Sequence, residues 1–116
     1  LIRVNCPKCS EKFTPDAKTL IAMNLRPEQN QHVQFSRGAG CEFCKGTGYR
    51  GRKGIFEMMV MTRQIRDLAF DKAPAGQIRK AAIANGMNTL AMDGVRKVMS
   101  GMTSPDEVVR VARMDD

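Results

Sequence analysis

The chain has 116 residues, enough for one domain or for a small domain joined to a metal-stapled module. Its formal net charge of +7 suits an anionic partner, but an aromatic content of 5% without tryptophan disfavours a base-stacking nucleic-acid platform. No apolar run approaches the roughly 18–20 residues that span a bilayer, and no signal peptide opens the sequence, so we expect a soluble protein of a reducing compartment.

Residues 1–54 contain all four cysteines and one convincing helix. The chain opens on Leu1 in a segment that reads as the middle of a strand, so we interpret it as a piece of a larger protein. The order Thr14-Pro15-Asp16 predicts a helix start, because the threonine can cap, proline fits the first helical position and aspartate favours the positive end of the helix dipole. Residues 28–40 are polar and contain glycine, which is typical of a loop.

A short apolar run over residues 55–61 follows a glycine-rich stretch and predicts a buried strand. We expect its methionines, Met58, Met59 and Met61, to fill the core. This strand could pair with the opening residues 1–4. The cysteine-rich stretch would then be an excursion between two strands of one sheet.

Four helices are predicted from residue 62 onward. Thr62 can cap the first helix, and Asn85-Gly86 is a good left-handed stop for the second. The third spans about residues 88–100, and Ser104-Pro105-Asp106-Glu107 opens the fourth with a capping box. The side chains expected to face inward on the last two helices are Leu90, Ala91, Val95, Val98, Met99, Val108, Val109 and Ala112.

The sharpest motif is a pair of C-x-x-C turns, Cys6-Pro7-Lys8-Cys9 and Cys41-Glu42-Phe43-Cys44. Each turn places two sulfurs close enough to share a metal, and two turns complete a tetrahedral Cys₄ shell for one structural Zn²⁺. Two disulfides are disfavoured without a secretory signal, and a redox dithiol would not explain two pairs. The one histidine, His32, is expected in an exposed loop and not among the ligands.

The stretch Gly46-Thr47-Gly48-Tyr49-Arg50-Gly51 matches G-x-G-x-x-G, but a dinucleotide fingerprint needs a strand before it and a helix after it. Here it follows a metal-binding turn and leads into a predicted strand. We therefore interpret its glycines as letting the backbone wrap closely beneath the metal site. No phosphate-binding loop or catalytic constellation is visible, so no catalytic residue is predicted.

Arg50, Arg52 and Lys53 form the densest basic cluster of the sequence. Such a cluster is either a solvated loop or a contact with an anionic partner, which can be a phosphate or an acidic neighbouring surface.

Two stretches carry a resemblance to a known family. One is the C-P-x-C turn, the Thr-Pro helix start, the polar loop and the run from Gly40 to Glu57. The other is the tail, from Asn85-Gly86 through Asp93-Gly94 to Gly101, Thr103 and Val108. Together they resemble the C-terminal end of the secretion and pilus-assembly ATPases, namely the type II secretion traffic ATPase and the type IV pilus assembly ATPase.

The resemblance implies a non-catalytic part of a homo-hexameric, RecA-like, cytoplasmic ATPase that docks on inner-membrane secretion or pilus platform proteins. ATP and Mg²⁺ would be bound only in the full-length parent, whose Walker motifs lie upstream. The implied order is the end of the truncated core at 1–5, the tetracysteine zinc module at 6–50, a returning core strand at 51–61 and a helical subdomain at 62–116. At Arg50, Arg52 and Lys53 the resemblance places a subunit or nucleotide contact.

We therefore predict an α+β fold in which a small Cys₄ zinc-binding module is inserted between two core strands and is followed by a four-helix C-terminal subdomain. Two alternatives remain open. One is a stand-alone zinc ribbon that binds nucleic acid. The other is a chaperone-type module, because residues 41–48 match the C-x-x-C-x-G-x-G unit of the J-protein cysteine-rich domain, although that domain repeats the unit four times.

Overall fold

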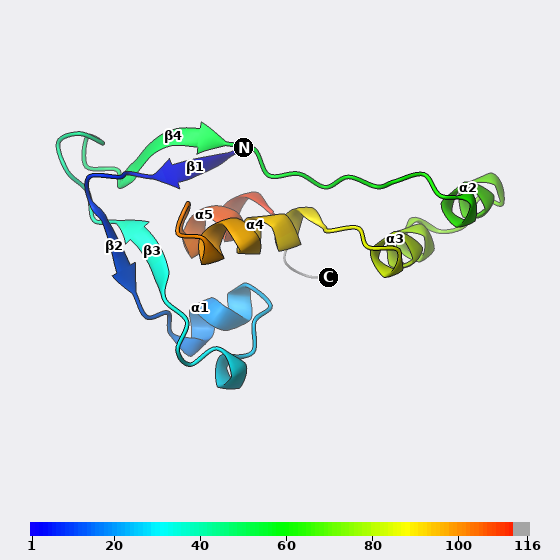
Figure 1. Ribbon diagram of the computed structural model, residues 1–116, viewed down its shortest axis with the longest axis horizontal. Helices are drawn as coiled ribbons and strands as arrows, with labels where there is room; N and C mark the ends of the chain where they lie inside the picture. The colour runs from blue at the N-terminus through cyan, green and yellow to red at the C-terminus, as the bar shows by residue number, and fades with distance from the viewer. Residues whose placement is uncertain (113–116) are drawn as a thin grey trace. The chain divides into compact units, whose positions relative to one another are not determined.

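The computed structural model describes residues 1–112 and divides the chain into two compact units (Figure 1). The first unit combines Leu1–Ile55 with Leu90–Asp116, of which residues 113–116 lie outside the described part; the second is Phe56–Thr89. Strands and helices are both present, which confirms the predicted α+β class. None of the described helices combines the length and the apolar character that a bilayer crossing requires.

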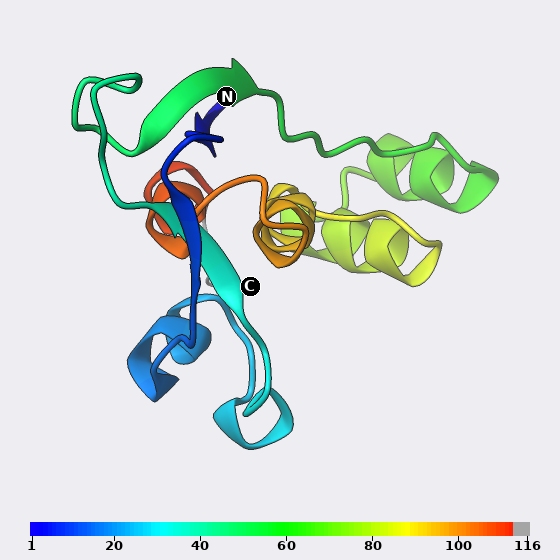
Figure 2. The ribbon, with the colours of Figure 1, turned by 60° about the vertical axis from the view of Figure 1, so that its left-hand side comes forward.

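Two antiparallel ribbons organise the first unit (Figure 2). Strand β1 (Ile2–Asn5) pairs with β4 (Tyr49–Lys53), and β2 (Ser10–Phe13) pairs with β3 (Phe35–Gly38). The chain thus leaves one strand at residue 5 and returns to the partner of that strand at residue 49. This confirms that the cysteine-rich stretch is an excursion between two paired strands.

The strand predicted over residues 55–61 is wrong: residues 54–62 belong to no strand or helix, and β4 ends at Lys53. The returning strand forms earlier because Cys6 N–H donates to the Gly48 carbonyl at 2.9 Å, which fixes the start of the β1–β4 pairing beside the cysteines. The methionines expected in the core are exposed. The exposed apolar side chains of this run, 42–75% accessible, are Phe56, Met58, Met59, Val60 and Met61.

Strands β2 and β3 are absent from the sequence-based prediction, which placed residues 28–40 in a loop. Phe35 anchors the ribbon: its side chain is fully buried and meets Phe13 on β2 edge to face, with ring centroids 6.3 Å apart. The helix after β2 is α1 (Ala17–Ala22), and Pro27–Gln29 forms a 3₁₀ turn, η1. The cap of α1 is Asp16 instead of the predicted Thr14, since its carboxylate accepts from Thr19 N–H at 2.8 Å.

Helices α4 (Leu90–Met99) and α5 (Pro105–Val111) complete the core of the first unit. They approach closely at Gly94, where a Cβ would lie 2.6 Å from Val108 Cγ1. Val109 and Met99 are exposed, contrary to prediction, because a short helix turns only one face to the core. The buried members of this core are Ile2, Leu20, Met23, Phe35, Ile55, Val98, Val108 and Ala112.

The second unit is a helix pair, α2 (Arg63–Phe70) and α3 (Ala75–Ala84), around a small core of Ile65, Ala81 and Ala82. Its capping follows the prediction, since Thr62 accepts from Ile65 N–H at 3.2 Å and Gly86 follows α3 with φ of +102°. All four predicted helices therefore form. They are divided between the two units, α2 with α3 and α4 with α5.

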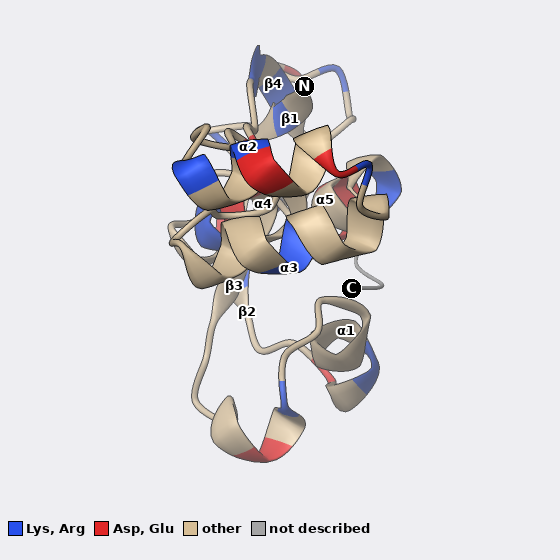
Figure 3. Ribbon diagram, turned by 90° about the vertical axis from the view of Figure 1, so that its right-hand side faces the viewer, with Lys and Arg blue, Asp and Glu red and all other residues tan. Residues whose placement is uncertain are grey.

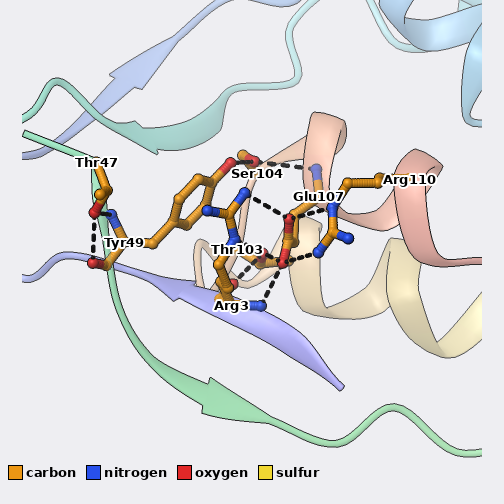
Figure 4. Close-up of polar contacts among 7 residues, drawn as sticks. All are labelled: Arg3, Thr47, Tyr49, Thr103, Ser104, Glu107 and Arg110. Atoms are coloured by element: carbon orange, nitrogen blue, oxygen red, sulfur yellow. Dashed lines mark hydrogen bonds and ion pairs between the residues drawn. The ribbon is translucent and has the colours of Figure 1, made fainter.

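A buried carboxylate joins α5 to β1 (Figure 4). Glu107, 1% exposed, accepts hydrogen bonds from Arg3 N–H at 2.7 Å and from Arg110 Nη2 at 2.9 Å, and pairs with the Arg3 guanidinium at 3.2 Å. Ser104 caps α5 by accepting from Glu107 N–H at 3.3 Å, as the capping box predicts. The Glu107 carboxylate, however, reaches across to β1, so one residue fixes strand and helix together.

Neighbouring contacts close the same junction. Thr103 Oγ1 donates to the Arg3 carbonyl at 2.7 Å, and the Tyr49 and Ser104 hydroxyls hydrogen-bond to each other (Figure 4). The Arg3 guanidinium lies 4.2 Å from the centroid of the Tyr49 ring. Since Tyr49 opens β4, the junction holds both strands of the first ribbon against α5.

We expect Glu107→Gln to lower stability in a pH-dependent way. Burial opposes ionisation of Glu107, but hydrogen bonds and charge from Arg110 and Arg3 outweigh it and lower its pKa from 4.5 to about 2. Because the folded pKa is the lower one, the stabilisation is fully present above pH 4.5 and is lost as pH falls through about 2. The expected loss near neutral pH is on the order of 3 kcal/mol.

Urea unfolding of both proteins from pH 7 down to pH 2 measures this effect. Protonation of the cysteines is common to both proteins and cancels in the comparison. Glu28→Gln, which removes an exposed carboxylate from η1, is the matched control and should change little. A difference between wild type and Glu107→Gln that stays constant with pH would contradict the assignment.

Candidate metal centre

The four cysteines lie where the two ribbons exchange strands. Cys6 follows β1 and Cys9 precedes β2, so the first C-x-x-C turn joins one ribbon to the other. Cys41 and Cys44 stand between β3 and β4 and join the same two ribbons in the opposite direction. The pairing of β1 with β4 and of β2 with β3 therefore brings together two turns that are 35 residues apart in sequence.

The sulfur positions fit a tetrahedral metal. All four Sγ atoms lie within 4.8 Å of one another. The Cys6–Cys41 and Cys9–Cys44 sulfurs are 3.8 Å apart, and the Cys41–Cys44 sulfurs are 3.7 Å apart. Four sulfurs at Zn–S of about 2.3 Å in a regular tetrahedron stand about 3.8 Å from one another. The cluster can therefore hold one metal ion with four protein ligands.

The same distances argue against the other uses of paired cysteines. A disulfide brings its sulfurs to about 2.05 Å, whereas the four thiols are free and the three distances above are 3.7–3.8 Å. A redox dithiol would engage one C-x-x-C turn, but here sulfurs of both turns converge on one point. The arrangement leaves no ligand position open, which is the pattern of a structural site.

Backbone N–H groups complete the surroundings of the sulfurs. Cys44 Sγ accepts from Cys41 N–H and from Gly48 N–H, both at 3.2 Å, and Cys9 Sγ accepts from Gly40 N–H at 3.3 Å. Such hydrogen bonds stabilise negative charge on sulfur. They come from the peptide groups of the turns themselves, so the turn geometry and the electronic state of the sulfurs are coupled.

Two glycines allow the backbone before and after the second C-x-x-C turn to approach closely. A Cβ on Gly48 would lie 2.5 Å from the Gly38 carbonyl oxygen, and a Cβ on Gly38 would lie 2.0 Å from that of Gly48. Gly48 also has φ of +82°, a conformation that favours glycine. Among the glycines of residues 46–51, Gly48 thus allows the close backbone approach that we expected, whereas a Cβ on Gly46 or Gly51 would meet nothing within 4 Å. The G-x-G-x-x-G match leads into β4 and not into a helix, so it is no dinucleotide fingerprint.

The cluster needs a cation to become fully ionised. Burial and the hydrogen bonds with the neighbouring thiols together raise the pKa of the Cys9 thiol to about 12, although the Gly40 N–H group lowers it. Burial also opposes ionisation of Cys44, but the N–H groups of Cys41 and Gly48 outweigh it and lower its pKa to about 6. Four thiolates within 4.8 Å would repel strongly, and a divalent cation offsets that repulsion.

The remaining candidates of the sequence lie outside the cysteine cluster. His32 is exposed in the loop before β3, as predicted. The three basic residues, Arg50, Arg52 and Lys53, lie within β4, which carries Lys and Arg colouring in Figure 3. All three residues are exposed in the structure.

Sequence reasoning missed the role of Phe43. Its ring lies 4.1 Å from the Arg50 guanidinium and 4.3 Å from the Lys8 ammonium group, and its carbonyl accepts from Arg50 Nη1 at 3.1 Å. The signal was available in the motifs, since Lys8 and Phe43 occupy the same position of their C-x-x-C turns, directly before the second cysteine.

We expect Gly48→Ala to weaken metal binding far more than Gly51→Ala. Both glycines have positive φ, +82° and +89°, so both substitutions carry similar backbone strain. Only the alanine at 48 meets the Gly38 carbonyl, and only that clash moves the N–H that contacts Cys44. The expected gap in metal affinity is at least about tenfold, as measured by competition with a chelator. Equal affinities would show that the close approach of residues 38 and 48 is unimportant for metal binding.

Known proteins match almost the whole chain. The sequence model of the family described as "Type II/IV secretion system protein" matches residues 1–110. The chain is 37% identical over 109 residues to the type IV pilus assembly ATPase PilB of Thermus thermophilus, covering 94% of the chain and 12% of that protein. It is also 37% identical over 117 residues to the type II secretion system protein E of Aeromonas hydrophila, with 99% and 22% covered.

A third relative extends the pattern. The type II secretion system protein E of Pseudomonas aeruginosa is 34% identical over 113 residues, covering 97% of the chain and 22% of that protein. The chain therefore spans 12–22% of the length of these relatives. With a family match over residues 1–110 and relatives above 30% identity across nearly all of it, the chain belongs to the type II/IV secretion system protein family.

Proposed function

We propose that the chain is a non-catalytic, C-terminal part of a hexameric secretion or pilus-assembly ATPase, in which Cys6, Cys9, Cys41 and Cys44 bind one structural Zn²⁺. The observation that carries the proposal is the four-sulfur cluster within a chain that matches this family over residues 1–110. Zinc suits the cluster because thiolates are soft ligands and a closed tetrahedral Cys₄ shell is the usual structural zinc site.

The zinc module would have a structural role and would not take part in catalysis. A closed metal site has no position for substrate or water, so its contribution is to hold the two ribbons in place. ATP and Mg²⁺ would be bound by the rest of the full-length protein. The zinc module would support ring assembly and docking to inner-membrane platform proteins, which would keep the ATPase cytoplasmic and peripherally attached to the membrane.

The division of the chain follows from the same proposal. Residues 1–5 and 51–61 would belong to the core of the full-length protein, residues 6–50 would form the zinc module and residues 62–116 the helical subdomain. The exposed apolar side chains of residues 56–61 support this, because a cluster of large apolar side chains is usually covered by another segment. In the proposed full-length protein, other segments of the core would cover the run.

Basic residues of β4 give a candidate contact between subunits. Arg50 is engaged with Phe43, whereas Arg52 and Lys53 lie beyond it on the exposed end of the strand. We propose that this end faces an acidic surface or a nucleotide phosphate of the neighbouring subunit in the ring. Exposed ion pairs contribute only about 0–1 kcal/mol, so an effect of Arg52→Ala on assembly-dependent ATP hydrolysis would indicate a specific contact.

The test is Cys44→Ser in the full-length protein, purified without chelators. We expect about one zinc per subunit in the wild type and loss of zinc in the variant, because a neutral hydroxyl cannot replace a thiolate. Ring assembly and pilus or secretion output should fall, while ATP hydrolysis by the intact core persists in part. Ser100→Ala, which changes an exposed serine after α4, is the control.

Two outcomes would contradict the proposal. Less than about half a metal per subunit in the wild type would remove the zinc centre. A zinc-free variant that assembles and supports export like the wild type would remove the structural role of the module.

A further inference from the structure

The Phe43 ring receives two cations from two different parts of the chain. Lys8 belongs to the first C-x-x-C turn, and its Nζ lies 4.3 Å from the ring centroid. Arg50 belongs to β4, and its Cζ lies 4.1 Å from the same centroid. Phe43 itself stands in the second C-x-x-C turn and is 37% exposed. The ring thus connects both metal-binding turns and the strand that follows them.

We propose that Lys8, Phe43 and Arg50 form a clip that holds the two C-x-x-C turns together without the metal and slows the release of the metal once it is bound. The inference rests on the metal centre of the proposed function. It assigns Lys8, Phe43 and Arg50 as residues that position the two metal-binding turns. These three side chains supply no ligand, so they act on the metal through the positions of the turns.

The clip lies where it can control the distance between the two C-x-x-C turns. Each C-x-x-C turn fixes the spacing of its own two sulfurs by local geometry, but the distance between the turns depends on contacts between residues far apart in sequence. One such contact is the hydrogen bond from Cys6 N–H to the Gly48 carbonyl at 2.9 Å. The Lys8–Phe43 contact is a second, made by the residues that directly precede Cys9 and Cys44. Opening of the turns, which metal release requires, must break it.

Arg50 strengthens the clip by a second kind of contact. Its Nη1 donates to the Phe43 carbonyl at 3.1 Å while the guanidinium lies near the ring, so both the backbone and the side chain of Phe43 are held. Lys8 and Arg50 also bring positive charge to a site where four thiolates and one divalent ion sum to −2. The clip therefore has two requirements that can be tested separately. The side chain at position 43 must be aromatic, and the cations of Lys8 and Arg50 must be present.

The size of the effect follows from the strength of exposed cation–π contacts. Each is expected to change an equilibrium or rate by about two- to fivefold, so loss of both contacts changes metal release by about five- to thirtyfold. Leucine fills much of the same space without an aromatic face, whereas tryptophan offers a stronger one. The series Trp, Phe, Leu at position 43 thus separates attraction to the ring from simple packing.

The experiment follows zinc transfer from the metal-loaded protein to a chromogenic chelator in excess, where the rate reports release. We expect Phe43→Leu to release zinc about five- to thirtyfold faster than wild type and Phe43→Trp to release it no faster. Lys8→Gln should accelerate release about two- to fivefold. The matched control is Arg37→Gln, which removes a cation 4.4 Å from the Phe13 ring on the other ribbon and should leave the rate unchanged.

Three outcomes would contradict the clip. Wild-type release from Phe43→Leu, equal rates for Phe43→Leu and Phe43→Trp, or an equal acceleration by Arg37→Gln would overturn the clip. If Phe43→Leu does not load with metal, the test uses the rates of zinc release from Lys8→Gln and Arg37→Gln. The clip predicts faster release from Lys8→Gln, and equal rates would overturn it. Failure of the clip is distinct from failure of the metal centre, because a wild type that holds about one zinc per chain with unchanged variant rates refutes only the clip.

Discussion

The first unit is organised around four sulfur atoms that would repel one another when ionised, and the proposed metal ion would relieve that repulsion. The sulfurs lie within 4.8 Å of one another at the point where two ribbons exchange strands. A two-stranded ribbon is marginally stable on its own, and these ribbons have strands of four or five residues. A structural zinc contributes on the order of 10–16 kcal/mol in small modules, enough to offset the ordering of such short elements.

The second constraint joins the ends of the described chain. Glu107 contacts Arg3, 104 residues away, and thereby holds α5 on β1. The hydrogen bond between Tyr49 and Ser104 extends the same junction to the start of β4, directly after Gly48, whose N–H group contacts Cys44. The metal centre, the first ribbon and the last two helices are therefore one connected structure. By contrast, α2 and α3 form a separate unit with a core of few residues, which is small for independent stability.

Local chemistry was predictable from the sequence, and long-range pairing was less so. The cysteines, the glycines of the turns, the caps at Thr62 and Ser104 and the stop at Asn85-Gly86 each follow from a rule that acts over a few residues. Residues 55–61 were predicted as a strand because an apolar run indicates burial. The sequence pattern does not indicate which segment covers such a run, and in this structure its large apolar side chains from Phe56 onward are exposed. Strands β2 and β3 were missed because Phe35 alone supplies the buried face of a polar, glycine-containing stretch. Phe43 was missed because its two partners, Lys8 and Arg50, come from different parts of the chain.

The central claim is that all four cysteines hold one metal ion in a closed tetrahedral site. X-ray absorption spectroscopy at the zinc edge of the purified protein tests it most directly, since it reports the kind and distance of the ligand atoms. The account predicts four sulfur ligands at about 2.3 Å and no nitrogen or oxygen neighbour in the first coordination shell. A shell that contains nitrogen or oxygen, or a metal-free protein whose mass is lowered by the four hydrogens lost in forming two disulfides, would contradict it.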